Sequence, residues 1–350
     1  MARVSNFLGG FADAAVLLPI IALLSEQAGF SSSRLFLSAG LLYIASAYFF
    51  KIPMAVQPLK SISVSAIALG ATYDEIRIAA FSLGLFCLTL TFFNIEPWAK
   101  RVPVAIIHQI QVGLGVLLVT QGLKASSNMG VMLAALAVFL FPVVKNIPLM
   151  GLMALIGFVG AGFAETQPIW SPALDVIRPN LILTLLLPQL ALTLSNSVLG
   201  TRNACEAYFG ERASRVSLKN LLLSIGLGNC VSALLGGLPF CHGSGGVTAH
   251  VKSGAREAWS TALFGVLLIV LSGSVLVYPK MLIALLLITT GLFHMQLGIA
   301  TAKIKLGIAA GVTILTGNLL WVLGVAILGE IISHAYLQRS FGYSKASRSA

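Results

Sequence analysis

Long apolar segments recur from one end of the chain to the other, separated by short polar loops. Because a bilayer core about 30 Å thick takes about 20 helical residues to cross, this pattern predicts an all-α membrane protein with many spans. The candidate segments are 6–25, 34–50, 58–70, 75–94, 103–123, 129–145 and 147–163, followed by 180–200, 218–235, 242–252, 257–277, 279–299, 305–317 and 319–336. They form two groups of seven, and the most hydrophilic stretch, 202–219, is predicted to be a loop.

The two groups are related to each other. An odd number of crossings reverses the direction of the chain, so two halves of seven segments have opposite orientations in the membrane. "VLLPIIAL" (16–23) resembles "LLLPQLAL" (185–192), each in the first segment of its half. The third segments, "IPMAVQPLKSISV" and "LPFCHGSGGVTAHV", are both too polar and too interrupted for a full apolar span. Inverted repeats with interrupted segments at matching positions are typical of transporter binding sites near the membrane midplane.

The first interrupted segment predicts an anion site. Pro58 favours the first position of a helix and pushes Gln57 towards an extended conformation. We therefore expect a short extended stretch and then a half-helix that begins within the membrane. Its N-terminus presents free N–H groups and a positive dipole end, and Lys60, Ser61 and Ser63 add a charge and hydroxyl donors. The alternative is that Lys60 reaches the membrane interface or pairs with an acid such as Asp13.

The second interrupted segment predicts a matching half-helix. Gly243, Gly245 and Gly246 allow the backbone to approach a ligand closely, and Ser244 caps or donates. His242 is a candidate to donate to an oxyanion or to carry a proton. The alternatives are that the glycines form a plain kink and that His242 makes a structural contact.

Other polar side chains lie within the apolar segments. Asp13 in the first segment and Gln189, Asn196 and Ser197 in the eighth are candidates to line the site or couple it to a second ion. A second group of candidates, expected to face the other side of the pathway, comprises Gln109, Gln111, His294 and Gln296. The alternative for each is a hydrogen bond to a neighbouring helix.

Composition and charge agree with a membrane protein. Hydrophobic residues make up 57% of the chain and charged residues 9%, and the mean hydropathy is +0.95. The net charge of +11 is scattered over segment ends, so we expect no nucleic-acid partner. With fourteen crossings, sixteen lysines and arginines fall on the side of both termini and five on the other, which predicts cytoplasmic termini. A signal peptide at the start is the alternative, but Asp13 within the apolar stretch favours a retained span.

Catalytic and metal chemistry are not expected. The four cysteines, Cys87, Cys205, Cys230 and Cys241, lack the spacing of a disulfide framework or a paired metal site. Cys241 and His242 are adjacent with no third group to orient them, and the glycines match neither a phosphate-binding loop nor a dinucleotide fingerprint. We therefore expect no enzyme activity, no cofactor and no bound metal.

The two interrupted segments resemble known signature motifs. "IPMAVQPLKSISVSAIA" and "GGLPFCHGSGGVTAHVKSGAR" resemble those of the molybdate transporter type 1 family, a relative of the sulfate permease superfamily that lacks a STAS domain. "GGFADAAVLLPI", "IQVGLG" and "LLLPQLALTLSNSV" also match, so the resemblance runs from about residue 9 to residue 265. Ala55, Leu59 and Ser244 depart from the usual proline, methionine and alanine, and "VTAHVKSG" departs from the usual small and aromatic residues.

The resemblance implies a 7+7 inverted repeat with a core domain (6–95 and 180–277) and a gate domain (103–163 and 279–336). It implies a secondary transporter of a tetrahedral oxyanion, molybdate first and sulfate as the alternative, in the cell membrane. The motif residues that would bind the anion are Gln57, Pro58, Lys60, Ser61, Cys241, His242, Gly243, Gly245 and Gly246, with Ser244 between them. A co-transported proton, carried by His242 or Asp13, and a homodimer through the gate domain are further expectations. An anion channel or a non-transporting membrane scaffold is the alternative from another class.

Overall fold

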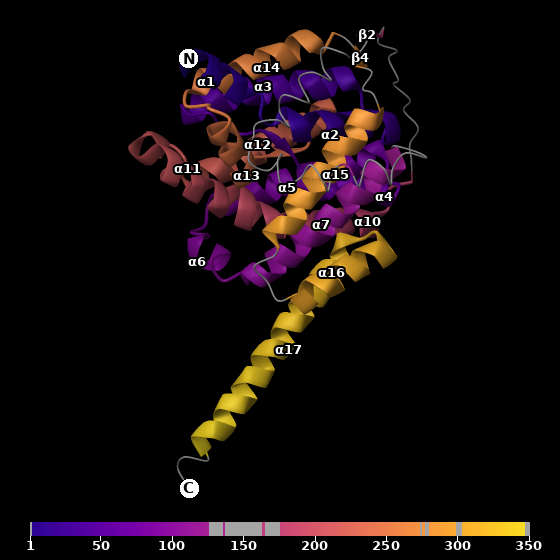
Figure 1. The fold of residues 1–350 in the computed structure, drawn as a ribbon, viewed down its shortest axis with the longest axis vertical. Helices are drawn as coiled ribbons and strands as arrows, with labels where there is room; N and C mark the ends of the chain where they lie inside the picture. The colour runs from indigo at the N-terminus through magenta and orange to yellow at the C-terminus, as the bar shows by residue number, and fades with distance from the viewer. Residues whose placement is uncertain are drawn as a thin grey trace.

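The computed structural model describes residues 2–125, 136, 163–164, 176–273, 275–276, 280–298 and 303–346. The predicted segments 129–145 and 147–163 therefore lie almost entirely outside the described residues. Within the described part, six helices are long and apolar enough to cross a membrane. Most helices gather into one body, and the last helix runs away from it towards the C-terminus (Figure 1).

The first half of the chain follows the predicted order closely. Its elements are α1 (Ala2–Gly10), α2 (Ala14–Gln27), α3 (Ser32–Phe50), β1 (Gln57–Pro58), α4 (Lys60–Ala68), α5 (Tyr73–Leu90), α6 (Glu96–Ala99) and α7 (Val104–Ala125). The first predicted span is divided into α1 and α2, and the break places Asp13 directly before α2. The predicted half-helix begins at Lys60 and not at Pro58, because Pro58 takes part in strand β1.

The second half repeats this order. Its elements are α10 (Pro179–Leu192), a π-helix (Thr193–Gly200), α11 (Thr201–Phe209), a 3-10 turn (Gly210–Ala213), α12 (Leu218–Leu235), β3 (Phe240–Cys241), α13 (Ser244–Lys252), α14 (Ala258–Leu271), α15 (Lys280–Leu297), α16 (Lys303–Thr316) and α17 (Leu319–Ala346). A short strand β2 (Phe163–Ala164) pairs with β4 (Val275–Leu276). The loop predicted for residues 202–219 was wrong at its start, because the helix continues to Phe209. An Arg202–Glu206 pair at 2.8 Å supports that extension, and Gly210, with φ +54°, ends it.

The two interrupted segments meet as an antiparallel strand pair. Gln57 lies opposite Cys241 and Pro58 opposite Phe240, so α4 and α13 begin from the same short ladder. Asn229 of α12 closes the outer edge of β3, donating to the Phe240 carbonyl at 2.7 Å and accepting from its N–H at 3.0 Å. Irregular backbone inside a membrane protein requires such internal partners because no water is at hand.

Pairs of glycines allow long helices of one half to pack closely against helices of the other half. Gly40 of α3 lies against Gly265 of α14, and a methyl group on Gly84 of α5 would come within 2.9 Å of the carbonyl oxygen of Gly226 in α12. The second segment of the first half thus packs on the fourth segment of the second half, and the fourth segment of the first half packs on the second segment of the second half. Helices α7 and α15, the fifth segments, pair with each other through Gly115 and Gly291. Small residues at such crossings allow the backbones to pack closely in the membrane.

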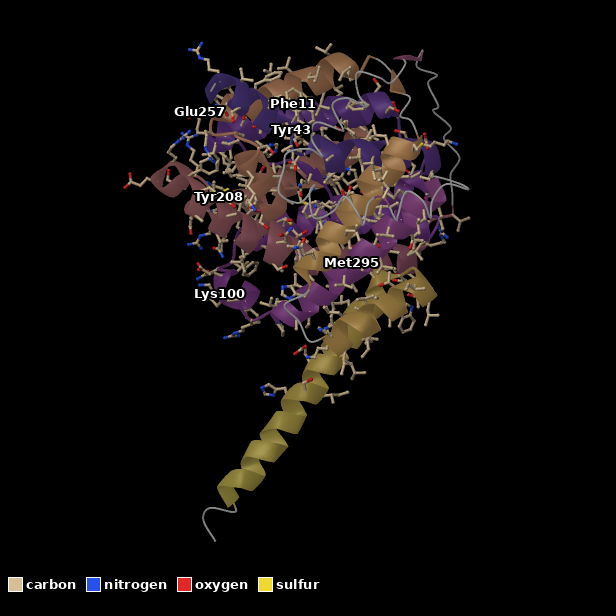
Figure 2. The ribbon with its side chains drawn as sticks, in the orientation of Figure 1. Phe11, Tyr43, Lys100, Tyr208, Glu257 and Met295 are labelled. Carbon is tan, nitrogen blue, oxygen red and sulfur yellow. The ribbon has the colours of Figure 1, made fainter. Side chains whose placement is uncertain are left out.

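An aromatic cluster lies in the interior of the helical body. The rings of Phe11 and Phe264 lie 5.2 Å apart in an edge-to-face arrangement, and Tyr43 packs on Phe264 at 5.1 Å. Figure 2 shows Phe11 and Tyr43 within the packed body, whereas Lys100 points outwards at its periphery. Tyr43 is fully buried, and its hydroxyl group reaches the polar network described below.

Candidate functional site

The start of α4 carries the lysine of the first interrupted segment. Lys60 is the first residue of this helix, and its Nζ atom lies 3.4 Å from Nε2 of His294 on α15. A lysine ammonium group has only donors, so His294 accepts through Nε2 and carries its hydrogen on Nδ1. The next N–H group of the helix, that of Ser61, donates to Oε1 of Gln189 at 3.1 Å. The N-terminus of α4 is thus held between α10 and α15.

Several buried polar atoms around α4 and α15 have no hydrogen-bond partner among the described residues. They are Ser61 Oγ, Ser63 Oγ, Ser65 Oγ, Thr290 Oγ1 and His294 Nδ1. Thr290 and His294 are four residues apart and share one face of α15. Buried polar groups are almost always paired, so a group of unpaired ones indicates a ligand or water site. With the Lys60 ammonium, this group is rich in donors.

The start of α13 presents a second helix N-terminus beside Gln57. Ser244 is its first residue, and the Ser244 hydroxyl donates to Oδ1 of Asn196 at 2.6 Å. Asn196 belongs to the π-helical stretch, a feature that often marks functional positions. Gly245 is exposed, with open space where a Cβ would be, while Gly243 is packed against the Gln57 amide oxygen. The glycines therefore leave room for a small ligand on one side and for Gln57 on the other.

Asp13 and Gln57 belong to a buried network that also includes two residues the sequence analysis did not single out, Tyr43 and His250. Gln57 Nε2 donates to Asp13 Oδ1 at 2.6 Å, and the Tyr43 hydroxyl donates to Asp13 Oδ2 at 3.1 Å. His250 Nε2 lies 2.9 Å from Asp13 Oδ2, and its Nδ1 atom lies 2.8 Å from the Gly9 carbonyl oxygen. Asp13 therefore pairs with His250 and not with Lys60, which contacts His294.

His242 has the geometry of the structural alternative. Its Nδ1 atom lies 2.7 Å from the Ala55 carbonyl oxygen, and its Nε2 atom lies 2.9 Å from the Ser224 hydroxyl. The Ala55 carbonyl only accepts, so Nδ1 carries the hydrogen and Nε2 accepts from Ser224. The ring is fully buried between Phe50 and Phe240. Both nitrogens are engaged inside the protein, which leaves neither for an anion.

Of five further predicted residues, two lie beside the starts of α4 and α13, and three lie on α7 and α15. Cys241 is buried on β3 opposite Gln57, and Gln189 ties α10 to α4 through Ser61. Gln111 is buried on α7, the helix that packs against both α4 and α15. Gln109 donates to a carbonyl of its own helix, and Gln296 is exposed.

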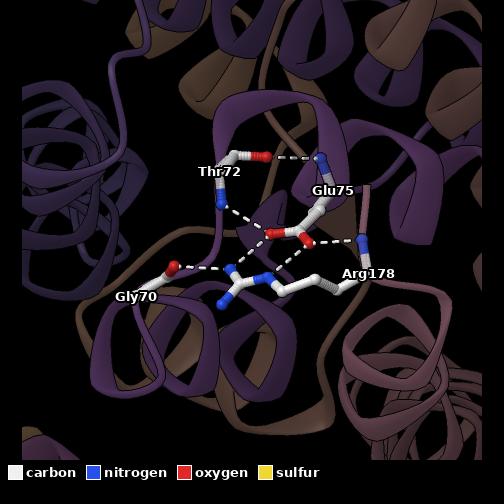
Figure 3. A network of polar contacts seen from close by, with 4 residues as sticks. All are labelled: Gly70, Thr72, Glu75 and Arg178. Atoms are coloured by element: carbon white, nitrogen blue, oxygen red, sulfur yellow. Dashed lines mark hydrogen bonds and ion pairs between the residues drawn. The ribbon is translucent and has the colours of Figure 1, made fainter. Parts of the chain in front are cut away.

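The far end of α4 is anchored by an ionic network (Figure 3). The Glu75 carboxylate, fully buried, accepts from the Arg178 guanidinium at 2.7 and 2.8 Å and from the Arg178 backbone N–H at 2.8 Å. Arg178 also donates to the Gly70 carbonyl just beyond α4, at 2.7 Å. Glu75 and Thr72 form a reciprocal capping box at the start of α5. The network joins the end of α4, the start of α5 and the start of α10.

Two surface cavities lie away from these residues. One, of about 520 Å³, is lined by the end of α5, by α6 and by residues of α11 and α12, and carries Glu96, Arg202, Glu206 and Lys219. The other, of about 550 Å³, is an apolar groove between α3 and α12. Neither is lined by residues of the α4 or α13 termini, so the candidate site is defined by those termini and their unpaired groups.

Comparisons with known proteins agree with the fold. The transmembrane domain of a cyanobacterial bicarbonate transporter, BicA, superposes with a TM-score of 0.60 over 93% of this chain and 98% of that domain, at 17% sequence identity. That similarity confirms the predicted all-α membrane fold; the number of spans remains a prediction. Molybdate transporter 1 of Arabidopsis thaliana is 23% identical over 339 residues, covering 77% of this chain and 72% of that protein.

Two further relatives bear similar descriptions. Molybdate transporter 2 of Arabidopsis thaliana is 22% identical over 327 residues, covering 75% of this chain and 70% of that protein. Molybdate transporter 1 of Chlamydomonas reinhardtii is 35% identical over 118 residues, which are 30% of this chain and 23% of that protein. The family model described as "Molybdate transporter of MFS superfamily" matches residues 5–118 and 182–293, more than half of the chain. The chain is a multi-pass membrane protein that belongs to this molybdate transporter family.

Proposed function

We propose that this protein is a secondary active transporter that carries a tetrahedral oxyanion, molybdate, across the cell membrane. The observation that carries the proposal is the meeting of two half-helix N-termini beside Lys60 and a group of unpaired buried donors. Helix N-termini favour anions through their N–H groups and dipoles. A charged lysine in a membrane segment is unfavourable unless it serves a ligand or a partner.

The chemistry of the site fits an oxyanion. Molybdate has only acceptors, and the Lys60 ammonium, which contacts His294, lies among the unpaired Ser61 and Thr290 hydroxyls and the unpaired His294 N–H. On the other side, the backbone runs from β3 into α13, whose first residue is Ser244, and the Gln57 amide of β1 lies against Gly243 just before that helix. We propose that the anion binds between these two sets, with Pro58 and the glycines fixing the backbone and no cofactor taking part.

The transport step is proposed to be alternating access. In this proposal α1–α5 and α10–α14 form the core domain, and α7 with α15–α17 forms the gate domain. The Lys60–His294 contact then joins core to gate in the conformation described here. An anion that enters between α4 and α15 competes for the same donors, so binding and the closing of the pathway are linked.

The experiment that tests the proposal is uptake of radioactive molybdate into proteoliposomes containing the full chain. Lys60→Ala removes a charged donor worth about 1.5–3 kcal/mol, so the affinity for molybdate should fall about 10- to 100-fold. Lys100→Ala, at an exposed lysine on the far periphery, is the matched control and should leave the affinity within about twofold. Full uptake by the Lys60 variant would contradict the site.

The same vesicles separate the remaining candidates. Sulfate, tungstate and molybdate are all tetrahedral dianions, so competition among them ranks the substrates and decides between molybdate and the sulfate alternative. A channel gives a flux that rises linearly with concentration, and a scaffold gives none. The proposal requires a flux that saturates and is inhibited by competing oxyanions.

A further inference from the structure

The hydrogen bonds around Asp13 fix the number of protons in this network. The Gly9 carbonyl accepts from His250 Nδ1, and the Asp13 carboxylate faces His250 Nε2. Asp13 and His250 therefore share one proton between Oδ2 and Nε2 and together carry no net charge, whichever of the two holds it. The pair is 0–1% exposed, and Tyr43 donates to the same carboxylate oxygen.

The orientation of the Gln57 amide depends on the protonation of Asp13. While Oδ1 of Asp13 carries no hydrogen, it can only accept, so Gln57 must turn its NH₂ group towards it, as the 2.6 Å contact requires. The amide oxygen of Gln57 is then left against Gly243, at the start of α13. A carbonyl oxygen at that position repels an anion bound at the same helix N-terminus.

A second proton on the pair reverses this orientation. When Oδ1 of Asp13 is protonated it becomes a donor, and the Gln57 amide satisfies it by a half-turn that brings Oε1 to Asp13. The NH₂ group then faces Gly243 and the start of α13, where it can donate to an oxyanion. Tyr43 and His250 keep their bonds to Oδ2, so the half-turn of one amide is the whole rearrangement.

The charges of the buried groups favour the same stoichiometry. Lys60 contributes one positive charge and the Asp13–His250 pair none, so a bound dianion leaves the cluster with one negative charge. One added proton brings the total to zero. Since a net charge buried away from water is strongly unfavourable, anion and proton should bind together.

We propose that one proton binds at Asp13 each time the anion binds, and that the Gln57 amide couples the two events. The inference rests on the proposed function and identifies the coupling ion and its position. The proton comes from the aqueous side that is open to the site, adds to Asp13 Oδ1, and leaves with the anion on the other side.

Other titratable groups lie near the Asp13–His250 pair, but their contacts suit them less well to bind the coupled proton. Lys60 on α4 and Cys241 and His242 on β3 lie within electrostatic range of Asp13, and Tyr43 donates to it from α3. His242 has both nitrogens engaged, and Lys60 faces His294. Asp13 is the member of this set that accepts a hydrogen bond from Gln57, whose amide is packed against Gly243 directly before α13.

Calorimetry of sodium molybdate binding to the full-length protein in nanodiscs tests the proposal. Titrations between pH 7 and pH 8.5 in buffers of different ionisation enthalpy count the protons taken up, in a range where molybdate itself remains a dianion. We expect about one proton per anion and an affinity that rises about tenfold for each unit fall in pH. Asp13→Asn should abolish both, while Asp74→Asn, at a surface carboxylate paired with Arg77, should change neither.

A second variant keeps the test independent of the folding of Asp13→Asn. Gln57→Met removes the amide but leaves Asp13, Tyr43 and His250 in place, so binding should weaken and lose its pH dependence. Binding without proton uptake in the natural protein, or proton uptake that persists in folded Asp13→Asn, would overturn the inference while the Lys60→Ala result still supports the anion site. Absence of any molybdate binding by the natural protein would overturn the proposed function and the coupling with it.

Discussion

His242 and His250 show how tertiary partners decide what one type of side chain does. Both lie in the second interrupted segment and both are fully buried. His242 uses its two nitrogens on a backbone carbonyl and a serine hydroxyl, whereas His250 uses one of its nitrogens on the Asp13 carboxylate. The first arrangement is satisfied by a neutral ring, whereas in the second the two side chains share a proton.

This difference leads to a prediction for His242. Replacing it with alanine leaves the Ala55 carbonyl and the Ser224 hydroxyl without partners, so the free energy of unfolding should fall by about 2–3 kcal/mol. His242→Asn, which retains a donor, should recover part of that loss. The thermal unfolding midpoint measures both effects, and molybdate affinity of the folded protein should stay within about threefold. An unchanged midpoint together with a loss of molybdate binding would show that His242 binds the anion.

Some residues of the candidate site could be predicted from the sequence and others could not. Lys60, Ser61 and Gln57 were predictable because a proline followed by polar groups interrupts an apolar segment. Tyr43 and His250 were not, because an aromatic residue and a histidine in separate segments give no local sign that both contact Asp13. His294 was predicted to face the site from the other side, and its contact with Lys60 has that geometry.

The helix ends around the site are held by charges placed at their termini. Glu75 at the start of α5 receives the side chain and the backbone N–H of Arg178, which precedes α10. The same arginine reaches the Gly70 carbonyl beyond α4, so three helix ends depend on one ion pair (Figure 3). Because α4 carries Lys60 at its other end, the network also fixes the position of the proposed anion site.

We predict that Glu75→Gln destabilises the protein. Breaking a fully buried pair costs about 3–5 kcal/mol, and because the Arg178 side chain is 47% exposed we expect a smaller loss, about 2–3 kcal/mol. Asp74→Asn, one residue earlier, breaks a partly exposed pair with Arg77 and should cost less than about 0.5 kcal/mol. Thermal unfolding of the two variants in the same detergent gives the comparison. Equal midpoints would show that the Glu75 network contributes no stability.

The sequence predicted which elements exist better than where each one ends. The half-helices α4 and α13 were expected from a proline and from a run of glycines, and both are present after short strands. The pairing of those strands could not be predicted, since two-residue strands have no periodicity to detect. The helix through Phe209 was missed because its polar residues resemble a loop, although they form a favourable pair one turn apart.

The arrangement of the helices relates the two halves to each other. Helices α3 and α5 pack on α14 and α12 through glycines, and an inverted repeat exchanges these two contacts with each other. The same repeat maps the α7–α15 contact onto itself. An inverted repeat has an odd number of membrane crossings in each half, and this is the assumption behind the predicted orientation of the termini.

That orientation can be tested across a single helix. Lys100 precedes α7 and Lys124 lies in its last turn, and both side chains are exposed, Lys100 at the periphery in Figure 2. The positive-inside rule places Lys100 in the cytoplasm and Lys124 outside. Cysteines at these two positions should therefore react differently with a membrane-impermeant maleimide. Cys87, Cys205 and Cys241 are buried, so with Cys230→Ala the background reaction should be low.

We expect Lys124→Cys to be labelled in intact cells and Lys100→Cys only after the membrane is made permeable. The reverse result would place both termini outside and would invert the predicted direction of every segment. Labelling of both positions in intact cells would mean that α7 does not cross the membrane, and the seven-segment count of the first half would then be wrong. Each outcome gives a different topology because the two lysines flank one apolar helix of 22 residues, long enough to span the bilayer once.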